Sequence, residues 1–147
     1  MACLTPMIPP SLSAVRIEPA GVEHLEAIAA LARIVWRARY PGIIALEQIE
    51  YMLARMYDVR VMEEECGCGV TYDRLLVGDT LYGFASYGPI AEPGALKLHK
   101  LYVHPEVQRL KLGSALLRHV EASARGHGYA TLVLAVNRKN EIGRAHV

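Results

Sequence analysis

A strand, a loop, an amphipathic helix and a second, wholly apolar strand follow one another between residues 95 and 136. The first strand is closed by His104-Pro105, and the helix begins near Gly113. The second strand, residues 131–136, carries only apolar side chains after its threonine, which is typical of a strand buried on both faces. Two strands joined by a helix in this way are expected to lie in one sheet. The segment therefore predicts a fold in which helices pack on a sheet.

The chain before this unit alternates between helical and strand patterns. Apolar residues recur at helical spacing in two stretches, and three others are rich in β-branched and aromatic residues. We expect strands at 15–18, 70–77 and 81–87 and helices at 25–40 and 49–56. The acidic run at residues 63–65 is expected to belong to a solvated loop. Together these elements predict a single mixed α/β (α+β) domain over residues 15–141, preceded by a flexible extension, residues 1–14.

Composition restricts the class of protein. With 147 residues, 52% hydrophobic and 21% charged, the chain fits one soluble globular domain. No apolar stretch is long enough for a membrane span, and the N-terminal residues lack the pattern of a signal peptide, so we expect a cytoplasmic protein without membrane contact. Cys66-Gly67-Cys68 could supply half of a zinc site, but no second Cys/His pair follows at ligand spacing, and we expect no metal.

The two parts of the chain carry opposite charge. Residues 1–92 hold 7 basic and 12 acidic side chains, whereas residues 93–147 hold 9 basic and 3 acidic ones. The loop before Gly113 brings Arg109 and Lys111 to a helix N-terminus, where backbone N–H groups and the helix dipole attract anions. This suits a phosphate or pyrophosphate, and the alternative is an ordinary strand-to-helix turn with a basic surface. The net charge of +1 argues against nucleic acid as a partner.

The residues around this loop also carry a family resemblance. The stretch from Leu98 to Leu117 resembles the acetyl-coenzyme A (acetyl-CoA) binding motif of the GNAT superfamily of N-acetyltransferases. That motif is Gln/Arg-x-x-Gly-x-Gly/Ala after a strand that ends near His-Pro, and Gln108 matches its first position and Gly113 its last. The resemblance covers roughly residues 15–140. It implies a GNAT-like acyltransferase fold, with a central, mostly antiparallel, twisted sheet flanked by helices.

The resemblance implies where acetyl-CoA would bind. The backbone of residues 101–103, at a splayed strand end, would pair with the pantetheine arm, and backbone N–H groups of residues 109–114 would hold the pyrophosphate. An N–H near Tyr102 or Val103 would polarise the thioester carbonyl, which gives Tyr102 a catalytic position. The implied cofactor-binding residues are Leu101, Tyr102, Val103, Gln108, Arg109, Leu110, Lys111, Leu112, Gly113, Ser114, Asn137 and Asn140.

The resemblance also implies a reaction in which a primary amine of a small molecule, or a protein N-terminus, attacks the thioester directly. His99 is the candidate base, because Lys97 stands where many relatives have a glutamate; a packed or solvated histidine is the alternative. Trp36, Tyr40 and Tyr87 are the candidate acceptor-site residues, with core packing as the alternative. A homodimer is the assembly that relatives suggest. A non-catalytic acetyl-CoA or CoA-binding module and an anion- or nucleic-acid-binding domain are the alternative functions.

The sequence departs from the family pattern in two places. Lys111 replaces the first glycine of the motif, whose missing side chain lets the backbone approach the phosphates, so weakened acetyl-CoA binding is expected. Relatives continue after the asparagine-rich turn with a tyrosine-bearing helix and two strands, whereas residues 142–147 match a peptide that a sequencing adapter would encode in frame. We therefore expect the last strands to be missing, residues 131–136 to form an exposed edge, and residues 142–147 to be a non-native tail.

Overall fold

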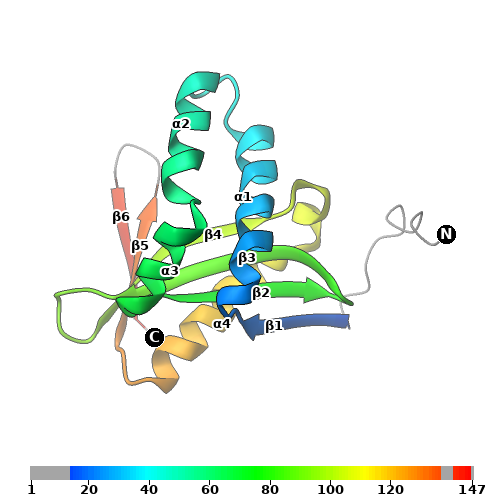
Figure 1. The fold of residues 1–147 in the computed structure, drawn as a ribbon. Coiled ribbons are helices and arrows are strands. Elements are labelled where there is room, and N and C mark those ends of the chain that lie inside the picture. Colours follow the sequence, from blue (N-terminus) through cyan, green and yellow to red (C-terminus); the bar gives the residue numbers. More distant parts are fainter. Residues whose placement is uncertain (1–13, 137–140, 147) are drawn as a thin grey trace.

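A single six-stranded sheet with helices on both faces forms the framework of the chain (Figure 1). The computed structural model describes residues 14–136 and 141–146. The strands are β1 (Val15–Pro19), β2 (Thr71–Val77), β3 (Thr80–Pro89), β4 (Ala95–Val103), β5 (Thr131–Val136) and β6 (Glu141–His146). The helices are the 3₁₀ helix η3 (Val22–His24), α1 (Leu25–Arg39), α2 (Leu46–Met56), α3 (Val59–Gly67), the 3₁₀ helix η4 (Pro105–Leu110) and α4 (Leu112–Gly126).

The strands are arranged in the order in which they occur in the chain, β1-β2-β3-β4-β5-β6. Every neighbouring pair is antiparallel except β4 and β5, which run parallel and are joined through η4 and α4. This confirms the predicted strand–helix–strand unit and the mostly antiparallel mixed sheet. The hairpin between β2 and β3 is confirmed as well, because Val77 pairs with Thr80 and Gly78 takes the positive φ of 61° that the tight turn requires.

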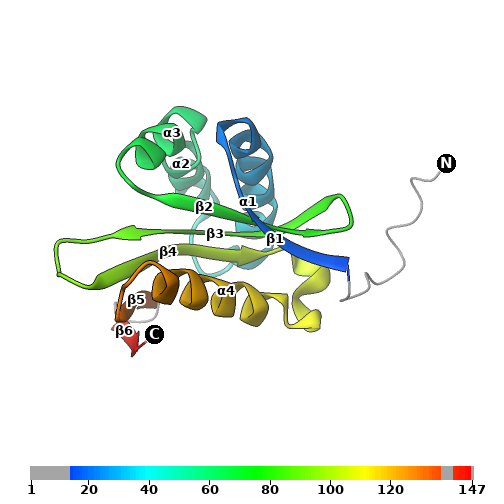
Figure 2. The ribbon, with the colours of Figure 1, turned by 90° about the horizontal axis from the view of Figure 1, so that it is seen from below.

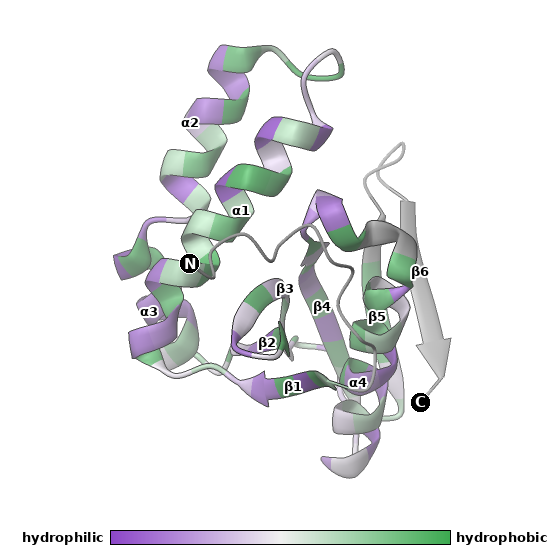
Figure 3. Cartoon of the chain, turned by 90° about the vertical axis from the view of Figure 1, so that its right-hand side faces the viewer, coloured by the Kyte–Doolittle hydropathy of each residue, from purple (hydrophilic) through white to green (hydrophobic). Residues whose placement is uncertain are grey.

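The helices divide into two layers. Figure 2 shows the sheet edge-on, with α1, α2 and α3 on one side and α4, preceded by η4, on the other. Each layer buries its own apolar cluster, one centred on α1 and Phe84 and the other on α4 and Leu75. Figure 3 shows apolar and polar residues alternating around α1, α2 and α4, as expected for helices that each place one face on a core.

Two sequence expectations are corrected by the structure. The acidic segment at residues 63–65 is part of the helix α3, because the Asp58 carboxylate accepts a hydrogen bond from the backbone N–H of Arg60 at 2.9 Å and Met62 is fully buried on the inner face. The sheet also does not end at β5. Residues 141–146 pair with the whole of β5 as the antiparallel strand β6, so β5 is not an edge strand.

None of the helices in residues 14–136 has the length and apolar character needed to cross a bilayer.

Candidate functional site

The first feature of the candidate site is the point where β4 and β5 part. Their parallel pairing joins Ala95–Leu98 of β4 to Thr131–Leu134 of β5. Both strands continue past this point, but the ladder between them ends there. Among the described residues, β4 beyond Leu98 is not paired with β5, so this part of β4 borders the point where the two strands separate. This is the splayed arrangement expected for residues 101–103.

A β-bulge in β4 lies directly at this point. On β3 the adjacent residues Ser86 and Tyr87 pair with Lys100 and Leu98, so His99 is the extra residue of β4. The bulge reverses the alternation of the strand. Leu98 and Leu101 both pack toward the α4 layer, whereas Lys100 and Tyr102 face the α1–α3 layer.

The N-terminus of α4 lies over the end of β4. Its first turn carries no acidic residue and no side-chain cap, so backbone N–H groups of residues 112–114 have no partner within the helix. A Cβ at Gly113 would stand 3.7 Å from Val103 Cγ2 and 3.9 Å from Leu101 Cδ2, which places the helix start in direct contact with the strand. Backbone N–H groups that have no partner within the helix, together with the positive end of the helix dipole, make this junction suitable for a phosphate group.

Lys111 holds the junction in a strained conformation. Its φ of 59° and ψ of 30° lie in the left-handed region, and it is the only non-glycine residue with positive φ in the described ranges. This conformation costs a residue with a side chain roughly 1–2 kcal/mol. The glycine usual at this motif position is therefore explained by backbone conformation, a reason that the sequence alone did not provide.

A cavity of about 170 Å³ opens beside this junction. It is lined by residues 101–103 of β4, by Gly113, and by Val35 and Arg39 of α1. Sequence reasoning missed Arg39, since nothing in its local pattern distinguishes it from the other arginines on the exposed side of α1. Here it adds a guanidinium group to the wall opposite the α4 N-terminus.

Aromatic side chains at the C-terminal end of α1 pack near Tyr102 of β4. The ring of Trp36 lies 4.7 Å from that of Tyr40 and 6.4 Å from that of Tyr102. Trp36 is only 4% exposed, so it is mainly a core residue, whereas Tyr40 is half-buried. Burial and the neighbouring Tyr40 raise the pKa of Tyr102 well above its usual range, so this phenol stays protonated at neutral pH.

His99 and Lys100 place two basic groups at the bulge. The His99 side chain is largely accessible, and partial burial together with the charge of Lys97 lowers the pKa of its imidazole. At neutral pH the imidazole is therefore unprotonated and able to accept a proton.

Lys100, which the sequence analysis did not single out, is 7% exposed. Its ammonium donates to the Tyr72 hydroxyl at 2.7 Å, lies 3.6 Å from a Glu65 carboxylate oxygen, and sits 4.6 Å above the Tyr57 ring. Burial lowers its pKa, and Glu65 opposes that shift.

The structure does not bring all the expected residues together. Tyr87 lies on the α4 side of the sheet and donates to Asp73 at 2.6 Å, away from Trp36 and Tyr40. Asn137 and Asn140 fall outside the described residues. The backbone of Gln108 and Arg109 belongs to η4, next to Leu110, and residues 112–114 form the first turn of α4.

No group of three His, Cys, Asp or Glu side chains in the described part of the chain is arranged to hold a metal ion. Cys66 and Cys68, the pair considered for zinc, are both free thiols at the end of α3.

Comparison with known proteins assigns this arrangement to a family. Residues 28–145 match the acetyltransferase (GNAT) family, and the chain belongs to it. The match includes the opening between β4 and β5, the bulge at His99 and the junction at Gly113. The chain therefore has the fold of an acyl-CoA-dependent acetyltransferase.

Individual relatives agree with this assignment. The chain is 30% identical over 134 residues to the spermidine N(1)-acetyltransferase of Thermoplasma acidophilum, covering 88% of this chain and 82% of that protein. It superposes with a TM-score of 0.75 on the PaiA N-acetyltransferase of the same organism in complex with coenzyme A, at 26% identity and with 86% and 82% of the two chains covered. A putative GNAT acetyltransferase of Desulfovibrio desulfuricans gives a TM-score of 0.63 at 28% identity, covering 82% and 72%.

Proposed function

We propose that this chain transfers the acetyl group of acetyl-CoA to a primary amine of a small molecule or of a protein N-terminus, by direct attack of the amine. The observation that carries the proposal is the parting of β4 and β5 beneath an uncapped helix N-terminus, in a chain of the GNAT family. A relative named as a spermidine acetyltransferase and another solved with coenzyme A support an amine acceptor and a CoA donor. The proposal includes a cytoplasmic location, which the small number of cysteines favours.

The residues at the junction fit the cofactor. Backbone N–H groups of residues 112–114 would hold the pyrophosphate, and the glycine at 113 leaves the close approach to β4 open. The second half of β4, with Leu101 and Tyr102, would bind the pantetheine arm through its backbone on the side facing β5. Arg39 would add a positive charge from α1. When bound, acetyl-CoA supplies the acetyl group as an activated thioester.

The bulge supplies the groups that act on the acceptor. His99, unprotonated at neutral pH, would take the proton that the amine loses as its nitrogen bonds the acetyl carbon, while the C–S bond breaks and CoA leaves as its thiolate. Tyr40, half-buried above Tyr102, would form one wall of the acceptor site. Trp36 would support that wall from the core. The main contribution of the protein is to position the amine against the thioester.

The experiment that tests the proposal has two steps. Acetyl-CoA is first titrated calorimetrically into the chain, and micromolar or tighter binding is expected. Release of free CoA thiol is then followed with a panel of amines that includes spermidine, simple primary amines and peptides with free N-termini. Amine-dependent release supports the transferase. Tight binding without release by any amine would instead indicate a non-catalytic acetyl-CoA-binding module, and no binding by the folded chain would contradict both.

A further inference from the structure

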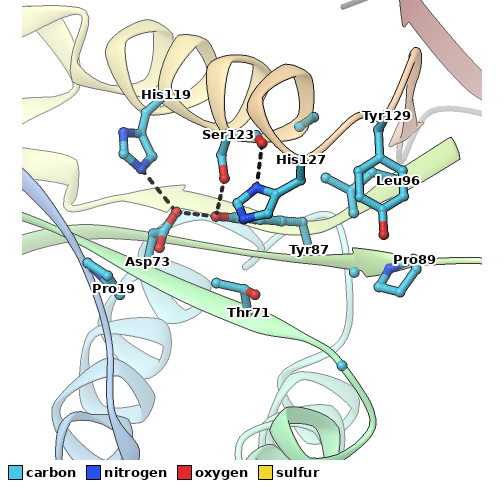
Figure 4. A pocket seen from close by; sticks show the side chains of 13 residues that line it. Pro19, Thr71, Asp73, Tyr87, Pro89, Leu96, His119, Ser123, His127 and Tyr129 are labelled. Carbon is cyan, nitrogen blue, oxygen red and sulfur yellow. Dashed lines mark hydrogen bonds and ion pairs between the residues drawn. The ribbon is translucent and has the colours of Figure 1, made fainter. Parts of the chain in front are cut away.

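A larger cavity lies at the other end of α4, away from the site described above. Its volume is about 500 Å³, and it is enclosed by the C-terminal half of α4, the start of β2 and the end of β3 (Figure 4). It shares no lining residue with the 170 Å³ cavity at Gly113. The polar side chains that line it are those of Thr71, Asp73, Tyr87, His119, Ser123, His127 and Tyr129.

The most unusual of these groups is the Asp73 carboxylate. Its side chain is only 3% exposed, although it borders the cavity. Both of its side-chain contacts fall on one oxygen, since Oδ2 accepts from the Tyr87 hydroxyl at 2.6 Å and lies 3.3 Å from His119 Nε2. The other oxygen, Oδ1, forms no hydrogen bond with the described residues and is not fully buried, so it is available to a ligand in the cavity.

The surroundings of Asp73 lack a permanent positive charge. In the described part of the chain no lysine or arginine forms an ion pair with it, and the adjacent Arg74 is directed to Glu18 at 3.2 Å instead. Among the described residues His119 is its one basic partner, and the imidazole is charged only when protonated. Burial raises the pKa of Asp73, while hydrogen bonds from Tyr87 and the proximity of His119 oppose that shift. The position therefore favours any cation that can reach the free oxygen.

The rest of the cavity wall suits a hydrocarbon group. Pro19 of β1, Pro89 of β3 and Leu96 of β4 contribute apolar surface, and Tyr129 closes one end, as Figure 4 shows. A few polar groups inside a mostly apolar, concave wall are typical of small-molecule sites. A volume of this size accommodates a ring or a short chain together with a charged head group.

We propose that this cavity is a second ligand site, which binds a small organic ammonium ion through Asp73. The ammonium nitrogen donates to Asp73 Oδ1, and the hydrocarbon part lies against Pro89, Leu96 and Tyr129. The site does not depend on the acetyl-transfer proposal, because no residue that would hold the cofactor lines it.

Three probes of similar shape and different charge test the proposal: benzylamine, benzyl alcohol and benzoate. Each is titrated into the ¹⁵N-labelled chain at neutral pH without acetyl-CoA, and backbone amide shifts are followed. Benzylamine is expected to shift the amide signals of Thr71, Gly88 and Ser123. It is also expected to bind about 10-fold more tightly than benzyl alcohol, because its ammonium group forms a charged hydrogen bond with Asp73. Equal affinity of these two probes, tighter binding of benzoate, or shifts confined to residues 101–103 would overturn the proposal.

Matched variants test whether the charge of Asp73 is the cause of the preference for benzylamine. Asp73→Asn is expected to abolish the preference for benzylamine over benzyl alcohol. Asp79→Asn makes the same change at a fully exposed aspartate in the β2–β3 turn and is expected to leave the preference intact.

Because Asp73→Asn alters a buried hydrogen-bonded group and could affect folding, Thr71→Tyr provides a second variant. It places bulk at an exposed β-strand position on the cavity wall and is expected to weaken all binding there. Unchanged benzylamine binding in folded Thr71→Tyr would also contradict the site.

Discussion

The two ends of α4 face two different kinds of site. At the N-terminus the helix presents backbone N–H groups over β4, with Gly113 in contact and Lys111 strained. At its C-terminal half the helix presents side chains, of which His119 reaches the buried carboxylate of Asp73. The first end attracts anions and the second attracts cations. The comparison teaches that a site made from backbone needs a local sequence motif, whereas a site made from side chains needs residues that only the fold brings together.

The largest expected effect concerns the N-terminal end. Gly113→Val should weaken acetyl-CoA binding about 100-fold, because a methyl at this position meets Val103 and Leu101 at ordinary contact distance and the two additional methyl groups of valine would occupy the adjoining cavity. Gly126→Val, the same change at the last residue of α4, has open space around it and should leave the affinity unchanged. Calorimetric titration of both variants measures the difference. Equal losses of acetyl-CoA affinity in the two variants would contradict the assignment of the cofactor to the N-terminal end of α4.

The next effect concerns the C-terminal half of α4. Tyr87→Phe should lower the free energy of unfolding by about 1–3 kcal/mol, because it removes the hydrogen bond that the buried Asp73 carboxylate accepts. Tyr82→Phe is the matched control, since the ring of Tyr82 lies against His104 at 6.1 Å on a partly exposed surface. Urea unfolding measures both variants. Acetyl-CoA affinity should stay at the parent value in Tyr87→Phe, and a loss there would show that the two sites are coupled.

A smaller effect is expected at Lys111, where two substitutions distinguish the backbone strain of this residue from its charge. Lys111→Gly should raise the free energy of unfolding by about 1 kcal/mol, because glycine adopts positive φ without the steric cost, and should tighten acetyl-CoA binding. Lys111→Ala removes the same charge but keeps a Cβ in the left-handed region, so it should gain no stability. Thermal unfolding and calorimetry give the two quantities. Unchanged or weaker acetyl-CoA binding by Lys111→Gly would show that the lysine charge assists the cofactor.

The smallest expected effect is a pH dependence of stability. Burial raises the pKa of Asp73 in the folded chain, so above about pH 4 the folded state binds more protons at this group than the unfolded state does. Its contribution to stability is therefore greatest at low pH and is lost as the pH rises through the raised pKa. Asp73→Asn should remove that decline, and Asp79→Asn should retain it. Urea unfolding across the acidic range is the measurement, and a parent-like decline in Asp73→Asn would contradict the assignment.

The fold was predictable where a local pattern determines it. The apolar run at residues 131–136 and the turn at Gly78 gave the correct strand pairings, and Gln108 to Gly113 indicated the correct strand-to-helix junction. The helix α3 was missed because its acidic residues resemble a loop until Met62 is seen to be buried. The strand β6 was missed because its pairing depends on β5 and not on its own composition.

The site was predictable only in part, for a related reason. The bulge at His99 arises from the pairing of two strands and shifts the alternation by one residue, so the inward position of Lys100 cannot be derived from period-two counting. Tyr87, which was expected beside Trp36, faces the α4 layer instead, on the opposite face of β3 from Phe84. Arg39 is far from β4 in the sequence, and only the fold brings it to the same cavity as residues 101–103.

The central claim is that acetyl-CoA binds where β4 and β5 part beneath the N-terminus of α4. Titration of coenzyme A into the ¹⁵N-labelled chain, with assigned backbone amides, tests it most directly. The account predicts that the largest shifts fall on residues 101–103 and 112–114, and that the amides around Asp73 stay in place. Largest shifts around Asp73 and His119, with residues 112–114 unmoved, would contradict it.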